Sequence, residues 1–403
     1  MRKLIAILTV IMLLLSLVCL TGCEQETPVG RVYFINSNPE ADEMWQKLAQ
    51  EYTETTGVQV KVYSVSQENA YAEVLAAMNS DWVPSMFLCQ DQEELKRWEG
   101  YVLELTDSAV YKACDERGFN LEDDQGKVWG VGYSYQVFGM IVNTQLLTQA
   151  GYEVTDITDF ASLKAVAEDI TARREELGFA AFASAGTDAR FAQQIANMVQ
   201  YYDAQDLENF KNLWDLYLDN AQCTREEMEG MSQLHAYNAF TSGEAVFYQN
   251  DAGCYDRLIS AGMEAENLTM IPLYCGVEGE ENAGLCCGTE DYWVVNAKAP
   301  IQDQEATLKF LEWVVNTDSC LQALAQQFGG VPFKKARTPE NVFFHAAGAL
   351  YDAGKYTVTW EYADLVQSRA WTEQFLSALK NYSQNMGDWA AVEAAYAACK
   401  QTP

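Results

Sequence analysis

Residues 31–62 read RVYFINSNPEADEMWQKLAQEYTETTGVQVKV, a stretch in which two apolar runs flank one amphipathic segment. Residues 31–35 predict a strand, and Asn38-Pro39 predicts a helix start, because Asn favours the N-cap and Pro fits the first helical position. Apolar residues recur at helical spacing up to Gly57, a residue that suits a left-handed helix end. Residues 58–62 alternate between valine and polar side chains, which predicts a second strand. The whole unit has the length of a parallel crossover.

Strands and helices alternate along the rest of the chain. Predicted strands include residues 85–89, 244–248 and 268–273, and long predicted helices include residues 160–177 and 304–316. This order predicts an α/β fold with helices on both faces of its sheets. Roughly 380 residues follow the N-terminal segment, enough for two domains. Because no Pro/Gly/Ser linker divides them, we expect two lobes joined by several crossing strands, with a ligand cleft between them.

The N-terminal segment has the pattern of an export signal. Arg2-Lys3 precedes a long apolar run, and Leu20-Thr21-Gly22-Cys23 follows it. This end resembles a bacterial lipobox, which implies cleavage before Cys23 and lipid on its thiol and new amino group. We therefore expect a lipoprotein signal peptide over 1–22 and a lipidated tether over 23–30, on the extracytoplasmic face of the cell membrane. An uncleaved membrane anchor and an ordinary signal peptide are the alternatives.

The net charge of −32 limits the classes of partner. A field of this sign repels nucleic acids and anionic lipid surfaces, and it disfavours ligands rich in phosphate. Hydrophobic residues make up 49% of the chain and charged residues 21%, which is typical of a globular protein. We therefore expect no nucleic-acid partner.

Cysteine and histidine usage disfavours disulfides and metal sites. Of the 11 cysteines, nine follow Cys23, an odd number without any CxxC pair. This irregular set predicts mostly buried thiols in place of a disulfide framework. The two histidines, His235 and His345, are far apart and lack zinc-ligand spacing. We expect neither a metal nor a cofactor.

Ordered motifs through the mature chain resemble one known family. They are Asn36-Ser37-Asn38-Pro39 with the helix ending at Gly57-Val58, Pro84–Leu88 before Asp91, Val128–Tyr133, Ile141–Leu147, Phe240–Phe247, Cys287-Gly288, Val294–Asn296, residues 306–315 and Gly329–Pro332. In this order they resemble the extracellular solute-binding proteins of bacterial ABC importers, in particular the sugar-binding, maltose-binding-protein-like (family 1) type. One departure is Asp251–Cys254, where the family often has a tryptophan.

The resemblance implies a periplasmic-binding-protein-like fold with two discontinuous lobes. The N-terminal lobe would comprise residues 31–134 and 276–333, and the C-terminal lobe residues 135–275 and 334–403. It also implies a monomer that captures a mono- or oligosaccharide by hinge closure, without catalysis. The bound sugar would then pass to the permease subunits of an ABC transporter.

Polar and aromatic side chains near the ends of predicted strands form the candidate site, because a sugar offers hydroxyls and apolar ring faces. They are Asn36, Asn38, Gln90, Asp91, Tyr133, Tyr135, Gln249, Asn250, Asp251, Glu290, Tyr292, Trp293 and Trp360. Several have structural alternatives. Asn38 and Asp91 can each cap a helix, and Tyr133 and Tyr135 can pack in the core. By strand alternation, at least one ring of Tyr292-Trp293 should face the core.

Three other functions compete with sugar capture. A tethered glycosidase would need two facing carboxylates, and the chain has no GxSxG, HExxH, P-loop or GxGxxG motif. An importer protein for ferric iron, or for another small solute, is suggested by Tyr201-Tyr202, since paired phenolates can hold iron. A helix end with one buried ring explains the same pair. The third alternative is a surface lipoprotein that binds a protein partner and no solute.

Overall fold

The computed structural model describes residues 30–115, 119–185, 188–202, 207–228, 230–289, 291–360 and 370–399. The chain divides into two compact units. The first comprises the residues up to Leu88 together with Trp98–Leu103 and Val294–Trp313, and the second comprises Cys89–Arg97, Glu104–Trp293 and the residues from Val314 on. The predicted signal peptide, Cys23 and nearly all of the predicted tether lie outside the described residues.

The first sheet has the strand order β2-β1-β3-β11-β5-β4. Its strands are β1 (Val32–Asn36), β2 (Val60–Ser64), β3 (Met86–Cys89), β4 (Asn120–Glu122), β5 (Val128–Gly132) and β11 (Tyr292–Val295). β1 is parallel to β2 and to β3, whereas β5 is antiparallel to β4 and to β11. The parallel crossover predicted from residues 31–62 is therefore confirmed.

The helix of this crossover begins with a single 3-10 turn, η1 (Pro39–Ala41), and continues as α2 (Asp42–Thr56). Gly57 ends α2 with a φ of 76°, as predicted for a residue without a Cβ. Asn38 occupies the N-cap position, but its side chain makes no capping hydrogen bond. Its backbone carbonyl accepts from the N–H of Ala41 at 3.1 Å. The predicted helix start, with Asn38 at the N-cap and Pro39 in the first turn, is confirmed.

The apolar face of α2 packs within the first unit. Trp45 is fully buried, and its ring meets that of Phe34 on β1 edge-on at a centroid distance of 5.3 Å. About two turns further on, Tyr52 meets Phe310 of α13 (Ile301–Asn316) at 5.1 Å. Full burial of one such ring contributes roughly 2–3 kcal/mol to stability. The sequence periodicity therefore identified the packed face correctly.

The second sheet has the strand order β12-β10-β6-β8-β7, and β9 pairs with β6 beside this path. Its strands are β6 (Gln136–Asn143), β7 (Ala180–Phe182), β8 (Ala245–Asp251), β9 (Leu268–Ile271), β10 (Ala283–Gly288) and β12 (Tyr356–Thr359). β6 is antiparallel to β8, β9 and β10, whereas β7 is parallel to β8 and β12 to β10. Along β6, Phe138 and Met140 enter one core while Val137 and Ile141 enter another. Both faces of this sheet are therefore buried.

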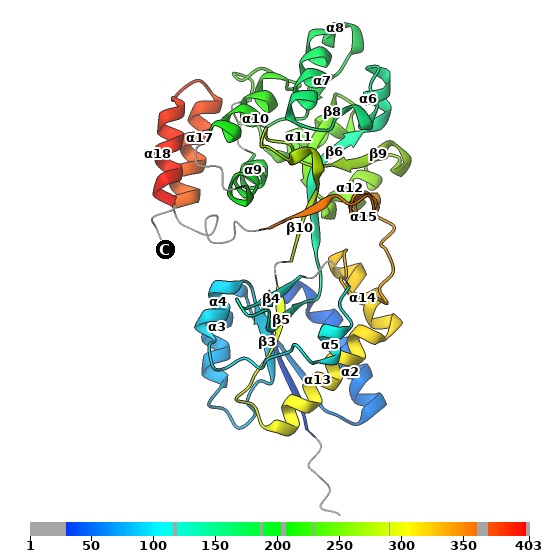
Figure 1. Ribbon diagram of the computed structural model, residues 1–403, viewed down its shortest axis with the longest axis vertical. Coiled ribbons are helices and arrows are strands. Elements are labelled where there is room, and N and C mark those ends of the chain that lie inside the picture. The colour runs from blue at the N-terminus through cyan, green and yellow to red at the C-terminus, as the bar shows by residue number, and fades with distance from the viewer. Residues whose placement is uncertain are drawn as a thin grey trace, which may run out of the picture. The chain divides into compact units, whose positions relative to one another are not determined.

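Helices accompany both sheets, which confirms the predicted α/β class (Figure 1). With the first sheet lie α3 (Gln67–Ala77), α4 (Gln92–Arg97), α5 (Ala109–Lys112), α13 (Ile301–Asn316) and α14 (Asp318–Phe328). With the second lie α6 (Thr144–Gln149), α7 (Phe160–Ala172), α8 (Arg174–Leu177), α9 (Ala189–Tyr201), α10 (Glu208–Asp219), α11 (Gln233–Thr241), α12 (Tyr255–Ser260), α15 (Val342–Asp352), α17 (Leu376–Ser383) and α18 (Trp389–Cys399). Short turns are η2 (Val154–Asp156), η3 (Ala252–Cys254), η4 (Ala265–Asn267), η5 (Glu280–Asn282) and the π-helical η6 (Trp371–Phe375). Among the described residues, none of these helices has the length and apolar character that a bilayer crossing requires.

The chain passes between the two sheets more than once. It leaves the first sheet after β5 and enters the second at β6, and it returns between β10 and β11. It reaches β12 of the second sheet after α13, α14 and α15. β10 belongs to the second sheet, whereas the predicted boundary at residue 276 assigns it to the first lobe. The lobe boundaries themselves stay a prediction.

No disulfide joins the nine cysteines from Cys89 to Cys399, all of which lie among the described residues. All but Cys223 are buried. Burial raises the pKa of Cys114 to about 12 and that of Cys223 to about 11. The thiols of Cys114 and Cys223 therefore stay protonated at neutral pH and are poor nucleophiles. The predicted set of buried thiols is confirmed.

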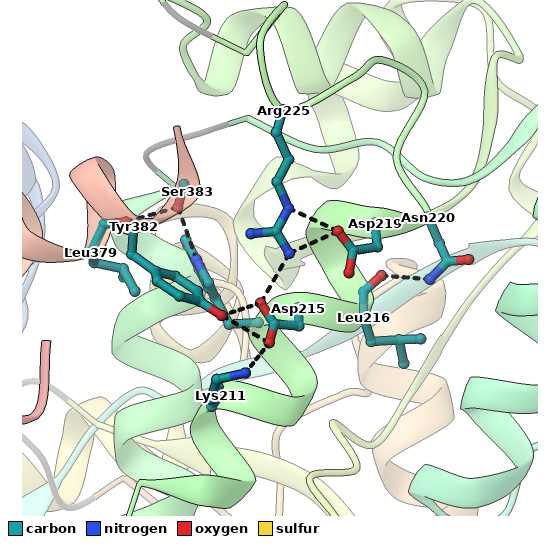
Figure 2. Close-up of polar contacts among 10 residues, drawn as sticks. Lys211, Asp215, Leu216, Asp219, Asn220, Arg225, Leu379, Tyr382 and Ser383 are labelled. Atoms are coloured by element: carbon teal, nitrogen blue, oxygen red, sulfur yellow. Dashed lines mark hydrogen bonds and ion pairs between the residues drawn. The ribbon is translucent and has the colours of Figure 1, made fainter. Parts of the chain in front are cut away.

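A charged network holds α17 against α10 (Figure 2). The carboxylate of Asp215 accepts hydrogen bonds from Nζ of Lys211 at 2.6 Å and from Nη2 of Arg225 at 3.0 Å. The hydroxyl of Tyr382 on α17 lies 2.8 and 3.0 Å from its two oxygens. One carboxylate thus joins α10, the loop that follows it and α17.

The network makes the stability of the fold depend on pH. Partial burial alone would raise the pKa of Asp215, but hydrogen bonds from Lys211, Tyr382 and Arg225 outweigh it and lower that pKa. A carboxylate with a lowered pKa stabilises the folded state while it is ionised. Its contribution is fully present above the unfolded pKa of about 4 and is lost as the pH falls through the lower, folded value.

We expect Asp215→Asn to lower the free energy of unfolding at pH 7 by about 1–3 kcal/mol, because two cations lose their shared carboxylate. The difference from wild type should shrink at pH values below about 4, where the native carboxylate becomes protonated. Urea unfolding at pH 7 and at pH 3 measures both effects.

Asp219→Asn is the matched control for this substitution. The side chain of Asp219 is 59% exposed, and its carboxylate contacts Arg225 at 2.7 Å. An exposed pair of this kind is worth less than about 1 kcal/mol. Equal losses in the two variants, or a loss at Asp215 that does not change with pH, would contradict the role given to the network.

Candidate functional site

Four strands of the second sheet begin or end at one edge. Phe138, near the start of β6, lies opposite Asp251 at the end of β8 and opposite Cys286 near the end of β10. Cys287 lies opposite Thr359, the last residue of β12. Residues at or just beyond these ends therefore gather in one place. The second-sheet edge is the group Arg190, Gln194, Gln249, Asn250, Asp251 and Trp360.

Helix α9 crosses this edge and supplies two of its members. Gln194 follows Arg190 by four residues and precedes Asn197 by three. At this spacing the three side chains lie on one side of the helix. Arg190 contacts the end of β8, and Nδ2 of Asn197 donates to the carbonyl oxygen of Thr359 on β12 at 3.0 Å. Because both neighbours reach the sheet, Gln194 also faces it.

A buried carboxylate fixes the start of α9. Asp188 is 3% exposed, and its Oδ1 accepts from the backbone N–H of Phe191 and from Nε2 of Gln233, both at 3.1 Å. Its Oδ2 accepts from the hydroxyl of Tyr217 at 3.3 Å. Burial raises the pKa of Asp188 although these hydrogen bonds favour the ionised form. The cap sets the position of the first helical turn, and so of Arg190.

The guanidinium of Arg190 is already engaged within the edge. Its Nη1 lies 2.7 Å from Oδ2 of Asp251 and also contacts Oδ1 of Asn250. Nδ2 of Asn250 in turn donates to the hydroxyl of Tyr248 at 2.6 Å. The Asp251 side chain is 21% exposed and that of Arg190 40%, so the pair is only partly screened by solvent. The carboxylate of Asp251 balances the charge of Arg190.

Two glutamine side chains at the edge are buried without hydrogen-bond partners. Gln194 is 0% exposed and Gln249 is 2% exposed. Neither the oxygen nor the nitrogen of either carboxamide has a partner among the described residues. Gln249 lies opposite Met140, whose side chain is in the core that α9 covers, so Gln249 faces α9. A polar group left this way costs roughly 1–3 kcal/mol, which makes the two amides the first candidates for ligand contacts.

An aromatic surface belongs to the same edge. Trp360 follows β12 and stacks on Phe138, with ring centroids 3.9 Å apart and an interplanar angle of 11°. Gly288 leaves room for this ring, because a Cβ at that position would lie 2.4 Å from the Cβ of Trp360. Trp360 is partly exposed, so part of its indole surface is accessible to a ligand.

Among the predicted residues of the first sheet, Asn36 and Asn38 form a local loop structure. Nδ2 of Asn36 donates to the carbonyl oxygen of Asn38 at 2.7 Å and to Oγ of Ser64 at 2.8 Å. Its Oδ1 accepts from the N–H of Asn38 at 3.1 Å. The buried amide of Asn36 therefore orders the loop after β1.

Gln90 and Asp91 follow β3 directly. Oδ1 of Asp91 accepts from the N–H of Glu94 at 2.7 Å and caps α4, which is the structural alternative foreseen for it. Nε2 of Gln90 is buried without a partner among the described residues. Tyr292 on β11 is partly buried, and burial raises the pKa of its phenol, with Cys89 and Asp91 adding to the effect. Gln90 is therefore the residue of this group with an unused amide.

Three predicted aromatic residues pack inside the protein. The ring of Tyr133 stacks on that of Trp293 at 4.8 Å and 11°, and both residues are fully buried. Tyr135 stacks on Phe119 at 5.0 Å and 17°. Core packing, the alternative foreseen for Tyr133 and Tyr135, describes their surroundings. Glu290 lies outside the described residues.

Tyr201 and Tyr202, the pair that suggested an iron-binding function, contact each other and Tyr356 of β12. The hydroxyl of Tyr202 lies 2.6 Å from that of Tyr356, and the rings of Tyr201 and Tyr202 meet edge-on at 5.0 Å. Burial, together with the bond to Tyr356, raises the pKa of Tyr202 and opposes the phenolate that ferric iron requires. Within the described ranges, no cluster of three or more His, Cys, Asp or Glu residues could hold a metal ion.

The second-sheet edge thus contains four predicted residues, Gln249, Asn250, Asp251 and Trp360, and two that the sequence did not reveal. In the sequence, Arg190 and Gln194 belong with Asn197 to a set of polar residues at helical spacing. The rest of that helix is largely apolar. A polar set of this kind commonly faces solvent. The contacts of α9 with β8 and β12 place it against the sheet instead.

One family matches most of the chain. The model for the family described as bacterial extracellular solute-binding protein matches residues 47–351. No match is found among curated proteins.

Several solved structures share this fold over nearly the whole chain. A family 1 extracellular solute-binding protein from Bifidobacterium longum subsp. infantis has a TM-score of 0.67 at 13% identity and covers 92% of this chain and 99% of that one. The apo form of RafE from Streptococcus pneumoniae has a TM-score of 0.69 at 15% identity, with 92% and 97% covered. The bacterial solute receptor AcbH has a TM-score of 0.68 at 14% identity, with 93% and 99% covered. The likeness confirms the predicted two-lobed fold.

We expect Gly288→Ala to displace Trp360 from Phe138, because the new Cβ would lie 2.4 Å from the Cβ of Trp360. The strain should lower the free energy of unfolding by about 1–3 kcal/mol and should change the tryptophan fluorescence. Gly348→Ala is the control, because a Cβ at that position of α15 meets nothing within 4 Å. It should keep or slightly raise stability, since Ala favours helix. Wild-type stability and fluorescence in Gly288→Ala would contradict the packing described for Trp360.

Proposed function

The chain belongs to the family of bacterial extracellular solute-binding proteins, and on this premise we propose that it is the substrate-binding component of an ABC transporter whose cargo is a carbohydrate. The second-sheet edge is the observation that carries this proposal. Trp360 offers an apolar ring surface there, and Gln194 and Gln249 offer carboxamides without protein partners. A sugar has the complementary groups, namely apolar ring faces and hydroxyls that both donate and accept.

The ligands of proteins with this fold support a carbohydrate over other small solutes. RafE has been solved in complex with raffinose. AcbH is described as having an exclusive substrate preference for β-D-galactopyranose. Another protein with this fold is a chitin oligosaccharide binding protein. A mono- or oligosaccharide is therefore the proposed ligand of this chain.

In the proposed mechanism the sugar first binds at the second-sheet edge. The two lobes, taken as residues 31–134 with 276–333 and residues 135–275 with 334–403, then close on it by a hinge motion. The monomer then delivers the sugar, in its closed conformation, to the permease subunits.

Capture without catalysis agrees with how the carboxylates near the edge are used. Asp251 is paired with Arg190, and Asp188 is bonded to Tyr217 and Gln233. A glycosidase needs one carboxyl group that can donate a proton and a second one facing it across the scissile bond. Carboxylates that are engaged in fixed structural bonds do not suit these roles.

We also propose that the mature protein is a lipoprotein, held on the extracytoplasmic face of the cell membrane by lipid on Cys23. The residues from 23 to 30 would form a short tether, since β1 begins at Val32. An anchor of this kind keeps a solute receptor close to its transporter.

A sugar that binds only the folded protein must raise the melting temperature. Purified mature protein should be screened by thermal shift against a broad panel of neutral mono- and oligosaccharides, with ferric citrate as the comparison ligand. We expect one sugar class to stabilise the fold by about 2.7 kcal/mol at a hundredfold excess over its Kd. If no sugar shifts the transition, the carbohydrate assignment fails, and a shift with iron alone would favour the alternative importer function.

Lipidation can be tested with a clickable fatty-acid probe in a bacterial host. The wild-type protein should be labelled and found in the membrane fraction, whereas Cys23→Ala should be unlabelled. Cys89→Ala is the control, because Cys89 is a buried thiol of the folded part and should label as wild type does. Equal labelling of wild type and Cys23→Ala would refute the anchor.

A further inference from the structure

We propose that Gln194 and Gln249 form a specificity pair at the second-sheet edge, and that this pair restricts the ligand to uncharged, polyhydroxylated molecules. Sugar acids and amino sugars would be rejected. The inference rests on the proposed function and names the class of carbohydrate that this edge accepts.

The two carboxamides reach the edge from different elements. Gln194 lies on the side of α9 that Arg190 and Asn197 hold against the sheet, and Gln249 lies on the face of β8 that α9 covers. Both are more than nine-tenths buried, and all four of their polar atoms lack partners among the described residues. The amides of Asn197 and Asn250, at the same edge, have partners. The unused hydrogen-bonding capacity is therefore concentrated in the two glutamines.

The chemistry of a carboxamide selects for hydroxyl groups. Its oxygen needs a donor and its NH₂ group needs an acceptor, and a hydroxyl supplies both. An ionised carboxylate placed against the pair only accepts, so it would leave the glutamine oxygens unbonded. An ammonium group in the same place only donates, so it would leave the NH₂ groups unbonded. Adjacent hydroxyls of a neutral sugar can satisfy each amide completely.

The charged groups around the edge also disfavour a charged ligand. Arg190, the cation of the edge, is already paired with Asp251 and in contact with Asn250. Asp188, at the start of α9, is bonded to Tyr217 and Gln233. An anionic ligand would meet a guanidinium that is already neutralised, in a chain of net charge −32. A cationic ligand would meet carboxylates that already have partners.

A specificity pair of this kind has an unusual consequence for stability. Replacing a glutamine whose carboxamide is hydrogen-bonded within the protein lowers the melting temperature. Removal of a buried amide that has no partner should instead raise it, while the ligand loses the same contacts. Stability without ligand and affinity for ligand should therefore change in opposite directions.

The test uses Gln194→Met and Gln249→Met, because methionine keeps the length of glutamine without its polar atoms. Gln222→Met is the matched control. The carboxamide of Gln222 accepts from the N–H of Ser184 at 2.7 Å and donates to its carbonyl oxygen at 2.8 Å. Melting temperatures are measured without ligand. Affinities are measured by calorimetry for D-glucose, D-galactose and raffinose, and for D-glucuronate, D-galacturonate and D-glucosamine.

We expect at least one neutral sugar to bind wild type and its charged counterparts to bind at least about a hundredfold more weakly. Each edge variant should lose about 10- to 100-fold in affinity while its melting temperature stays equal or rises by about 1–3 °C. Gln222→Met should melt lower and keep its affinity.

Four results would overturn the inference. If a neutral sugar binds but the charged counterparts bind equally well, or if the edge variants keep full affinity, the specificity pair is wrong while the proposed function stands. If the edge variants melt lower, as Gln222→Met should, the two glutamines are structural. If no sugar of this set or of the broad thermal-shift panel binds, the carbohydrate assignment fails and this inference fails with it.

Discussion

The capping of α9 by the buried carboxylate of Asp188 is the interaction on which the candidate site depends. It fixes the first turn of a helix that lies across the ends of several strands. Asn197, two turns further on, ties the same helix to the last residue of β12. Between these two points Gln194 has little freedom, and Arg190 meets the end of β8. The geometry of the edge therefore follows from how one helix is attached at both ends.

Buried amides differ in their hydrogen bonding between the first sheet and the second-sheet edge. Asn296 donates to the carbonyl of Pro84 at 2.7 Å and accepts from the N–H of Lys298 at 2.8 Å, so its amide serves the fold. Gln194 and Gln249 serve no such purpose within the described residues, although they are equally buried. Folded proteins rarely leave buried polar groups unbonded, and departures from the rule concentrate at functional sites. This local cost is the reason for proposing the second-sheet edge as the ligand-binding site.

Local patterns predicted the local structure well. The crossover in residues 31–62 and the helix end at Gly57 follow from periodicity and from the backbone freedom of glycine, and both are confirmed. The family indicated by the ordered motifs is confirmed as well. Asn38 takes the predicted N-cap position, although its side chain makes no capping hydrogen bond. Tyr133 follows a strand as a ligand contact would, yet it stacks in the core on Trp293.

By itself, the sequence determined the α/β class, most elements and the family. It predicted Gln249, Asn250 and Asp251 just beyond a strand, whereas they are the last three residues of β8. Only the tertiary structure decided that Arg190 meets Asn250 and Asp251, that Gln194 faces the same sheet, and that Trp360 shares their edge. The reason is physical. Helical and strand periodicity act over a few residues, whereas strand register and the crossing of α9 join positions far apart in the chain. Whether a polar side chain on a helix meets solvent, a partner or a ligand is set by what packs opposite it.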